Sequence, residues 1–349
     1  MASNNNSLNS MLSAPRSDAK RKHKNGITNM RIALRIAFIW PMFLISNVFA
    51  ASYPDKPIRV VVPYAPGGAT DTISRILTQK LSESMGQPVV VDNRPGAGGI
   101  IGTGIVARAV PDGYTVLTTA LPHVVNPSLQ AKVIPFNTAR DFTPVVKFIS
   151  YSSILVVNSS LPVNSVSDLI ELARREPGRL NYGASNGTMQ HLSGALFNNM
   201  GKVDMRFIPF KIGNQAMTSL LAGDIQVIFE GAVRALPFIK SGRVKALAVT
   251  SSDRSPFVPD LPTIAETGLP GYEVSSWVGM LLPSGAPAAI VSRLNAESNR
   301  LLQLDEVKKQ IAKFGAVPAG GTPEQFGSYL KEELVKWAAV VKQANIKAE

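Results

Sequence analysis

Short apolar runs alternate along this chain with longer stretches in which apolar residues recur at helical spacing. The short runs are rich in β-branched residues and predict buried strands at residues 58–62, 89–91, 115–119, 154–157, 180–183, 225–229 and 244–250. Between the first two runs, Ile73, Ile76, Leu77 and Leu81 share one face of a predicted helix. Regular alternation of strands and helices is typical of an α/β fold with a parallel sheet.

Capping residues predict where several helices begin. Thr70 or Asp71 is the expected N-cap of the first helix, and Ser165 with Asp168 resembles a capping box before a helix over residues 169–175. Near the C-terminus, Thr322 is expected to cap a helix whose first residue is Pro323. Aromatic and apolar residues recur with helical spacing through residues 326–341, which indicates a helix face packed in the core.

The first 50 residues have the pattern of a secretory signal peptide. Arg31 and Arg35 precede an apolar run over residues 36–50, with Val48 and Ala50 at the −3 and −1 positions of a cleavage site. The run is shorter than the about 20 residues that a membrane span requires. We therefore expect removal of residues 1–50, with Met1 or Met30 as the start, and export to the periplasm.

Composition excludes several classes of function. The chain has no cysteine, so disulfides, thiolate catalysis and cysteine-ligated metals are excluded, and its three scattered histidines argue against a histidine-rich metal centre. Residues 1–50 hold seven of the 36 Lys and Arg and one of the 24 Asp and Glu, so half of the net charge of +12 belongs to the leader. The remainder has no block of basic residues, and we expect no nucleic-acid partner.

Two motifs imitate those of enzymes. Residues 183–187 read GASNG, which matches the G-x-S-x-G turn around a nucleophilic serine, here Ser185. A hydrolase of that type requires a later histidine, and the last one is His191, only six residues on. The glycines at 96, 98 and 102 resemble a dinucleotide fingerprint, but the third stands one position late. A secreted serine hydrolase remains an alternative, and a nicotinamide-dependent dehydrogenase is less favoured.

Two loops share a design suited to anions. Residues 65–70 and 185–188 each follow a predicted strand, contain Gly with Ser, Thr or Asn, and lead into a helix. The first turn of a helix has unpaired N–H groups and a partial positive charge. Together these loops predict a carboxylate site formed mainly by the backbone, with ordinary helix capping as the alternative.

A series of motifs resembles the Bug family, the extracytoplasmic solute-binding proteins of tripartite tricarboxylate transporters. The series begins with YPDKPIRVVVPYAPGG at residues 53–68 and continues with NRPGAGG at 93–99, PDGY at 111–114, NPSL at 126–129 and DFTPV at 141–145. It ends with YGASNG at 182–187, LPT at 261–263, Trp277 and TPE at 322–324. These motifs extend over nearly the whole chain after residue 50, in the family's order.

The resemblance implies a two-lobed α/β fold of the type II periplasmic-binding-protein kind, with two sheets flanked by helices and a hinged cleft. Lobe 1 would comprise residues 53–150 and 279–349, and lobe 2 residues 151–278, with the crossings at apolar segments 149–157 and 274–282. A ligand carboxylate would lie between residues 64–71 and 183–188. The implied ligand-binding residues are Tyr64, Ala65, Pro66, Gly67, Gly68, Thr70, Asp71, Thr119, Ala120, Leu121, His123, Ser185, Asn186, Gly187, Thr188, His191, Phe210 and Glu230.

The resemblance further implies a monomeric binding protein without catalytic residues, metal or cofactor. Its partners would be a small carboxylate and either permease subunits or a membrane sensor receptor. The chain departs from the family at Leu121-Pro122, where relatives often have Gly-Thr, at Ile212 and at Gln226. We expect the first two departures to reshape the distal part of the pocket, and Tyr64, Leu121, Pro122, Phe210 and Glu230 to determine specificity.

Overall fold

The computed structural model describes residues 53–210, 213–344 and 346. The predicted signal peptide and the departure at Ile212 lie outside the described residues. The chain divides into two units, Met1–Tyr53 and Pro54–Glu349, and the following description concerns the second. Among its described residues, no helix is both long and apolar enough to cross a bilayer.

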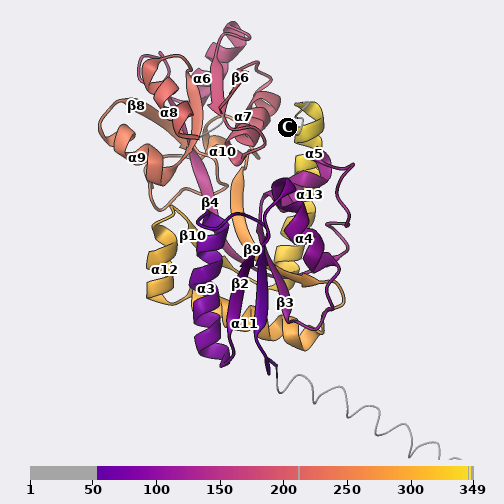
Figure 1. The fold of residues 1–349 in the computed structure, drawn as a ribbon. Helices are drawn as coiled ribbons and strands as arrows, with labels where there is room; N and C mark the ends of the chain where they lie inside the picture. The colour runs from indigo at the N-terminus through magenta and orange to yellow at the C-terminus, as the bar shows by residue number, and fades with distance from the viewer. Residues whose placement is uncertain (1–52, 211–212, 345, 347–349) are drawn as a thin grey trace, which may run out of the picture. The chain divides into compact units, whose positions relative to one another are not determined.

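Three parallel strands begin the fold. Strand β1 (Ile58–Val62) pairs on one side with β2 (Val89–Asn93) and on the other with β3 (Thr115–Ala120). Helix α3 (Ala69–Met85) connects β1 to β2, while the short helix η2 (Ala97–Gly99) and α4 (Ile100–Ala107) lead towards β3. This is the βαβ arrangement that the sequence predicts (Figure 1).

A second set of parallel strands follows in the middle of the chain. Strand β5 (Asn181–Ala184) pairs with β6 (Arg206–Pro209) and with β7 (Val227–Gly231). A further strand, β8 (Val244–Val249), pairs antiparallel with β4 (Phe142–Asn158). Four helices accompany these strands. The helices are α6 (Val166–Arg175), α7 (Met189–Gly201), α8 (Gly213–Ala222) and α9 (Ala232–Lys240).

Two long antiparallel strands join the sets. Strand β4 (Phe142–Asn158) pairs with β9 (Ser275–Pro283) from Phe142 to Ser152. The first part of β4 also pairs with β10 (Val317–Gly320), and its last part, from Ser153 onward, with β7 and β8. The strand predicted at residues 154–157 is therefore only the end of β4, and the complete sheet is mixed and not purely parallel.

The register places the carboxyl ends of both parallel sets towards the same stretch of β4. Ala120 at the end of β3 pairs with Val278, which pairs with Ile149, whereas Gly231 at the end of β7 pairs with Ser153. Ser153 stands four positions after Ile149 in the extended chain, which corresponds to about 13 Å at ~3.3 Å per residue. The loops that follow β1 and β5 therefore emerge from edges that face one another.

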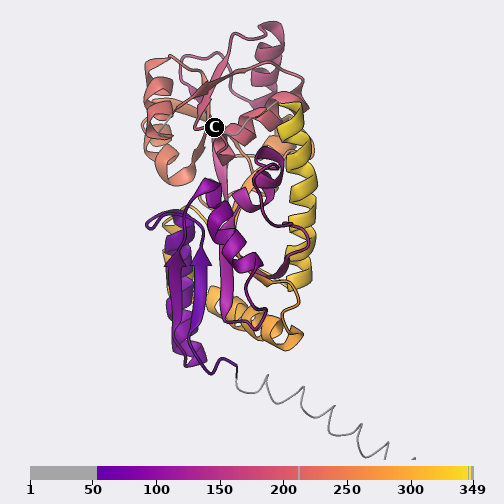
Figure 2. The same cartoon turned by 45° about the vertical axis from the view of Figure 1, so that its right-hand side comes forward.

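Helices of the last third of the chain pack mainly on β4 and β10. They are α11 (Ala288–Leu302), α12 (Asp305–Ala312) and α13 (Pro323–Gln343). Helix α13 packs on β4, on α5 (Pro122–Leu129) and, near its end, on α7, where Asn199 donates a hydrogen bond to Gln343. Figure 2 shows α13 in yellow along one side of this unit.

Several predicted boundaries are confirmed, and others are shifted; the strand predicted at 225–229, for example, is β7 over Val227–Gly231. Strand 58–62 and the helix starting at Pro323 have the predicted limits, and Thr322 forms the expected capping box with Gln325. Helix α3, however, has Gly68 as its N-cap instead of Thr70 or Asp71. The strand predicted at 115–119 is β3, which ends one residue later at Ala120, and α5, which begins at Pro122, was not predicted. The short helix α10 (Ile264–Thr267) follows a capping residue, Thr263. The division into lobes stays a prediction.

Candidate functional site

The loop between β1 and α3 presents a helix N-terminus to solvent. Gly68 has extended backbone dihedrals, and no side chain caps the helix there. The first helical hydrogen bond runs from the Thr72 N–H to the Gly68 carbonyl, so the amides before Thr72 have no partner within the helix. Residues 65–69 are all exposed. Gly68 and Ala69 therefore leave the start of the helix open to an anion.

Asp71 holds this loop from behind. Its buried carboxylate accepts hydrogen bonds from the Gly67 N–H at 2.9 Å, from Asn93 Nδ2 at 2.9 Å and from Arg75 Nε at 3.1 Å. Asn93 Nδ2 also donates to the Tyr64 carbonyl, which ties both ends of the loop to one amide. Burial raises the pKa of Asp71, but the bonds from Arg75, Gly67 and Asn93 outweigh burial and hold the pKa below its usual value.

Tyr64 forms the inner wall of the loop. Its hydroxyl lies 3.1 Å from Thr119 Oγ1 at the end of β3, and burial raises its pKa to about 12, so the phenol stays neutral. Gly99 packs under the ring: a Cβ there would lie 3.0 Å from Tyr64 Cε1, and its φ of +100° favours glycine. Thr119 and Ala120 are buried beside this contact.

The loop between β5 and α7 has a comparable geometry. Thr188 is the N-cap of α7, and its Oγ1 accepts from the His191 N–H at 3.4 Å and donates to the Ser185 carbonyl at 2.7 Å. Gly187 has φ +70° and donates its N–H to His191 Nδ1 at 3.1 Å. The loop is half-buried. A Cβ on Gly187 would lie 3.9 Å from Leu129 Cδ1 in α5, so this loop lies close to the first set of strands and helices.

The imidazole of His191 orients the loop and cannot activate Ser185. Burial lowers its pKa to about 4, and the ring stacks on Phe207 with centroids 3.8 Å apart. Because Nδ1 accepts from Gly187, the proton of the neutral ring lies on Nε2, which leaves no basic nitrogen for the serine hydroxyl. The geometry thus argues against the serine hydrolase alternative.

Two other predicted site residues lie at the same edge as this loop. Glu230, near the end of β7, is buried, and its Oε1 accepts from the Gly231 N–H at 2.8 Å and from Arg234 Nε at 3.0 Å. Burial dominates and raises the pKa of Glu230 despite the Arg234 guanidinium. Phe210 follows β6, and its ring would contact a Cβ at Gly183, which explains the glycine there.

The remaining predicted residues lie at or just before the start of α5. Leu121 is buried in the apolar core with Val124 and Val125. His123 lies in α5, packs edge-on against Phe142 at 5.0 Å and lines a different cavity. Pro122 is the first residue of α5. Their positions result from the helix that begins after β3.

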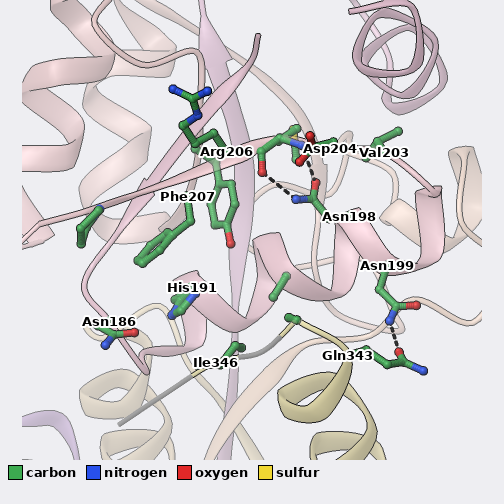
Figure 3. A pocket seen from close by; sticks show the side chains of 15 residues that line it. Asn186, His191, Asn198, Asn199, Val203, Asp204, Arg206, Phe207, Gln343 and Ile346 are labelled. Atoms are coloured by element: carbon green, nitrogen blue, oxygen red, sulfur yellow. Dashed lines mark hydrogen bonds between the residues drawn. The ribbon is translucent and has the colours of Figure 1, made fainter. Parts of the chain in front are cut away.

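Asn186 and His191 line a cavity of about 840 Å³ beside the second loop. Figure 3 shows it between α7, the strand carrying Phe207 and the end of α13, with Ile346 at its border. The cavity contains none of residues 64–71. It therefore lies next to the facing edges and not between them.

Within residues 53–210, 213–344 and 346, no group of three or more His, Asp or Glu side chains could hold a metal ion.

Sequence reasoning missed Asn93 and Leu129 as site residues. Asn93 is the last residue of β2 and lies at the same edge as Tyr64, so the rule that carboxyl ends of parallel strands share an edge could have found it. Nothing in the sequence brings Leu129 next to Gly187.

Comparison with known proteins assigns the chain to a family. Residues 73–346 match the family described as "Tripartite tricarboxylate transporter family receptor". A protein from the tcbD-tcbE intergenic region of Pseudomonas sp. strain P51 is 39% identical over 299 residues, which cover 85% of this chain and 89% of the relative. Protein BugT of Bordetella pertussis is 36% identical over 89% of this chain and 96% of its own.

Solved structures of similar proteins have the same fold. The R. palustris protein Rpa4515, solved with adipate, is 36% identical, with a TM-score of 0.68 over 84% of this chain and 99% of its own. MatC from Rhodopseudomonas palustris, solved with bound malate, is 33% identical, with a TM-score of 0.65 over 83% of this chain and 100% of its own. A Polaromonas solute-binding protein is 26% identical, with a TM-score of 0.76 over 83% of this chain and 99% of its own.

Proposed function

This chain belongs to the family of tripartite tricarboxylate transporter receptors, and from that premise we propose that it binds a small carboxylate between residues 64–71 and 183–188. The observation that carries the proposal is the pair of helix N-termini, of α3 and α7, at the facing carboxyl edges. The family consists of solute-binding receptors, and the carboxylate would pass to the permease subunits of a tripartite transporter.

Backbone amides supply most of the proposed binding energy. One helix N-terminus contributes about 0.3–1 kcal/mol to a nearby negative charge, and more in a partly buried site. The amides of Gly68 and Thr70 lack helical partners, and charge-assisted hydrogen bonds are about twice as strong as neutral ones. Asp71 and His191 would position the loops, because the Asp71 carboxylate binds the Gly67 N–H and His191 Nδ1 binds the Gly187 N–H.

Adipate and malate are the first ligands to test, because similar proteins were solved with them. Both are dicarboxylates, so one carboxylate could occupy the paired helix N-termini while the other reaches the distal wall. In this proposal Tyr64 and Phe210 border that wall. We expect a dissociation constant of micromolar order, about −8 kcal/mol.

The proposed ligand site lies at a hinge. Strand β4 exchanges its partner β10 at Ser150 for β7 at Ser153, which supports a boundary near residue 150 between lobe 1 and lobe 2. β9 ends its pairing with β4 at Ser275, close to the proposed second crossing. Lobe 1 would comprise residues 53–150 and 279–349, lobe 2 residues 151–278, and the lobes would close over the ligand. We further propose a monomer in the periplasm with cleavage near Ala50.

Replacing Gly68 by aspartate tests the site. The φ of −73° suits any residue, a Cβ would lie 3.6 Å from the Ala65 carbonyl oxygen, and aspartate is a favourable N-cap. Gly68→Asp should therefore fold normally while its carboxylate occupies the position of the ligand's. Isothermal calorimetry with adipate and malate should show binding weakened by about 100-fold or more, equivalent to about 2.7 kcal/mol.

Gly68→Asn is the matched control, because it adds the same volume without the charge. It should bind within about tenfold of the unmodified protein. Equal affinities of the aspartate and asparagine variants would contradict the proposed anion position. Stabilisation of the unmodified protein by sugars alone, with no response to carboxylates, would contradict the proposed ligand class.

A further inference from the structure

A second cavity, of about 750 Å³, lies within the part of the molecule formed by α5, the start of β4, α11 and α13. None of residues 64–71 or 183–188 lines it. Its walls include the apolar side chains of Phe142, Val291 and Leu330. Volumes of this size are typical of small-molecule sites.

Two polar side chains at this cavity have no partner among the described residues. His123 is 5% exposed, and neither of its ring nitrogens forms a hydrogen bond. The hydroxyl oxygen of Thr138 is likewise buried and unpaired. Both residues line the cavity. Because burial of an unpaired polar group costs free energy, two such groups at one cavity indicate a missing hydrogen-bonding partner.

Aromatic rings gather at the same place. The His123 ring meets Phe142 edge-on, with centroids 5.0 Å apart and planes at 80°. Phe142 in turn meets Phe136 edge-on at 5.6 Å. Edge-to-face packing leaves ring faces and edges that suit a further aromatic ring.

The electrostatic character of the cavity favours a neutral occupant. Burial lowers the pKa of His123 to about 3, so the imidazole is uncharged at neutral pH and offers one donor and one acceptor. Lys331 and Glu324 also line the cavity and balance one another in charge. A hydroxyl group both donates and accepts, and so complements a neutral imidazole and a threonine hydroxyl.

We propose that this cavity is a second binding site, which accepts a neutral aromatic molecule carrying a hydroxyl group. The ring of the ligand packs beside Phe142, and its hydroxyl bonds to His123 and Thr138. This site is separate from the proposed carboxylate site, so each can be occupied when the other is filled or empty.

2-Naphthol is a suitable probe, with 2-methoxynaphthalene and 2-naphthoate as matched compounds. Titration of the full chain, labelled with ¹⁵N in its imidazole rings, should show 2-naphthol shifting the signals of one histidine. His123→Phe, which keeps an aromatic ring against Phe142, should remove that signal. It should also weaken the binding of 2-naphthol by about tenfold, equivalent to about 1.4 kcal/mol. 2-Methoxynaphthalene, whose hydroxyl is methylated, and 2-naphthoate, which carries a charge, should each bind this cavity about tenfold more weakly than 2-naphthol.

Thr138→Val is the second variant, because it removes a hydroxyl with little change of shape in a partly exposed position. It should weaken the binding of 2-naphthol about threefold to tenfold. His191→Phe, the same change at the other buried histidine, should leave this affinity unchanged. Absence of binding up to the solubility limit, or equal affinity in the His123 and Thr138 variants and the unmodified chain, would overturn the proposal.

Discussion

At the residue scale, the Asp71 carboxylate fixes the loop that precedes α3. Asp71→Asn removes one charge-assisted bond to Arg75 and disturbs those from Gly67 and Asn93. We expect a loss of about 1–3 kcal/mol in the free energy of unfolding, measured by urea denaturation. Asp260→Asn, at an exposed position, should stay within about 0.5 kcal/mol of the unmodified protein. An equal loss in both variants would contradict this role.

Glu230 gives a pH dependence of the opposite sign to that of Asp71. Asp71 has a lowered pKa in the folded protein, so its contribution is present above its ordinary pKa and lost as pH falls through the folded value. Burial raises the pKa of Glu230, so its ionisation opposes folding as pH rises through the ordinary glutamate pKa of about 4.3 towards the folded value.

We therefore expect Glu230→Gln to gain stability relative to the unmodified protein between about pH 4 and pH 7. Urea denaturation of both proteins at the two pH values measures the difference. A constant difference across this range would show that ionisation of Glu230 does not oppose folding. The opposite trend would mean that Arg234 outweighs burial.

Both loops were predicted as anion sites from the sequence because glycine and small polar residues directly follow predicted strands, and the structure gives each of them a helix N-terminus. Sequence reasoning could not assign the role of Asn93, because Asp71, its partner, is 22 residues away in the chain. It also grouped His123 with the loops. The helix that begins at Pro122 gives His123 a different environment, and that helix contains Pro127, which argues against a helix by local pattern.

At the element scale, helix α13 depends on the capping box that its sequence predicts. The Thr322 hydroxyl accepts from the Gln325 N–H at 3.2 Å, and Gln325 Oε1 accepts from the Thr322 N–H at 2.9 Å. Thr322→Ala should lower the free energy of unfolding by about 1 kcal/mol in urea denaturation. Glu332→Ala, exposed on the same helix, is the control and should change it by less than about 0.5 kcal/mol. Similar losses would show that the cap contributes nothing specific.

The length of β4 was not predictable from its own pattern. Residues 150–153 are Ser, Tyr, Ser and Ser, which interrupt the apolar run at the point where the strand exchanges its partners. The strand continues there because β9 pairs with it, and that pairing joins residues more than 120 positions apart. By contrast, caps and short buried strands depend on neighbouring residues, and these predictions were confirmed at β1 and α13.

At the scale of the whole molecule, we expect the two proposed lobes to close about β4 and β9. The chain has no cysteine, so spin labels can be placed at chosen sites alone. The variant Gln79→Cys/Arg243→Cys places one exposed spin label on each proposed lobe. We expect adipate or malate to shorten or narrow the distribution of distances between the two labels, measured by pulsed electron–electron double resonance. An unchanged distribution in protein that calorimetry shows to be saturated would contradict closure.

The most direct measurement is a crystal structure of the unmodified protein with its best-binding carboxylate. We expect one carboxylate group within hydrogen-bonding distance of backbone amides from both residues 67–70 and residues 185–188, with Asp71 still bound to Arg75 and Gly67. A carboxylate bound elsewhere, or one held by a single loop and a Lys or Arg side chain, would contradict the proposed carboxylate site.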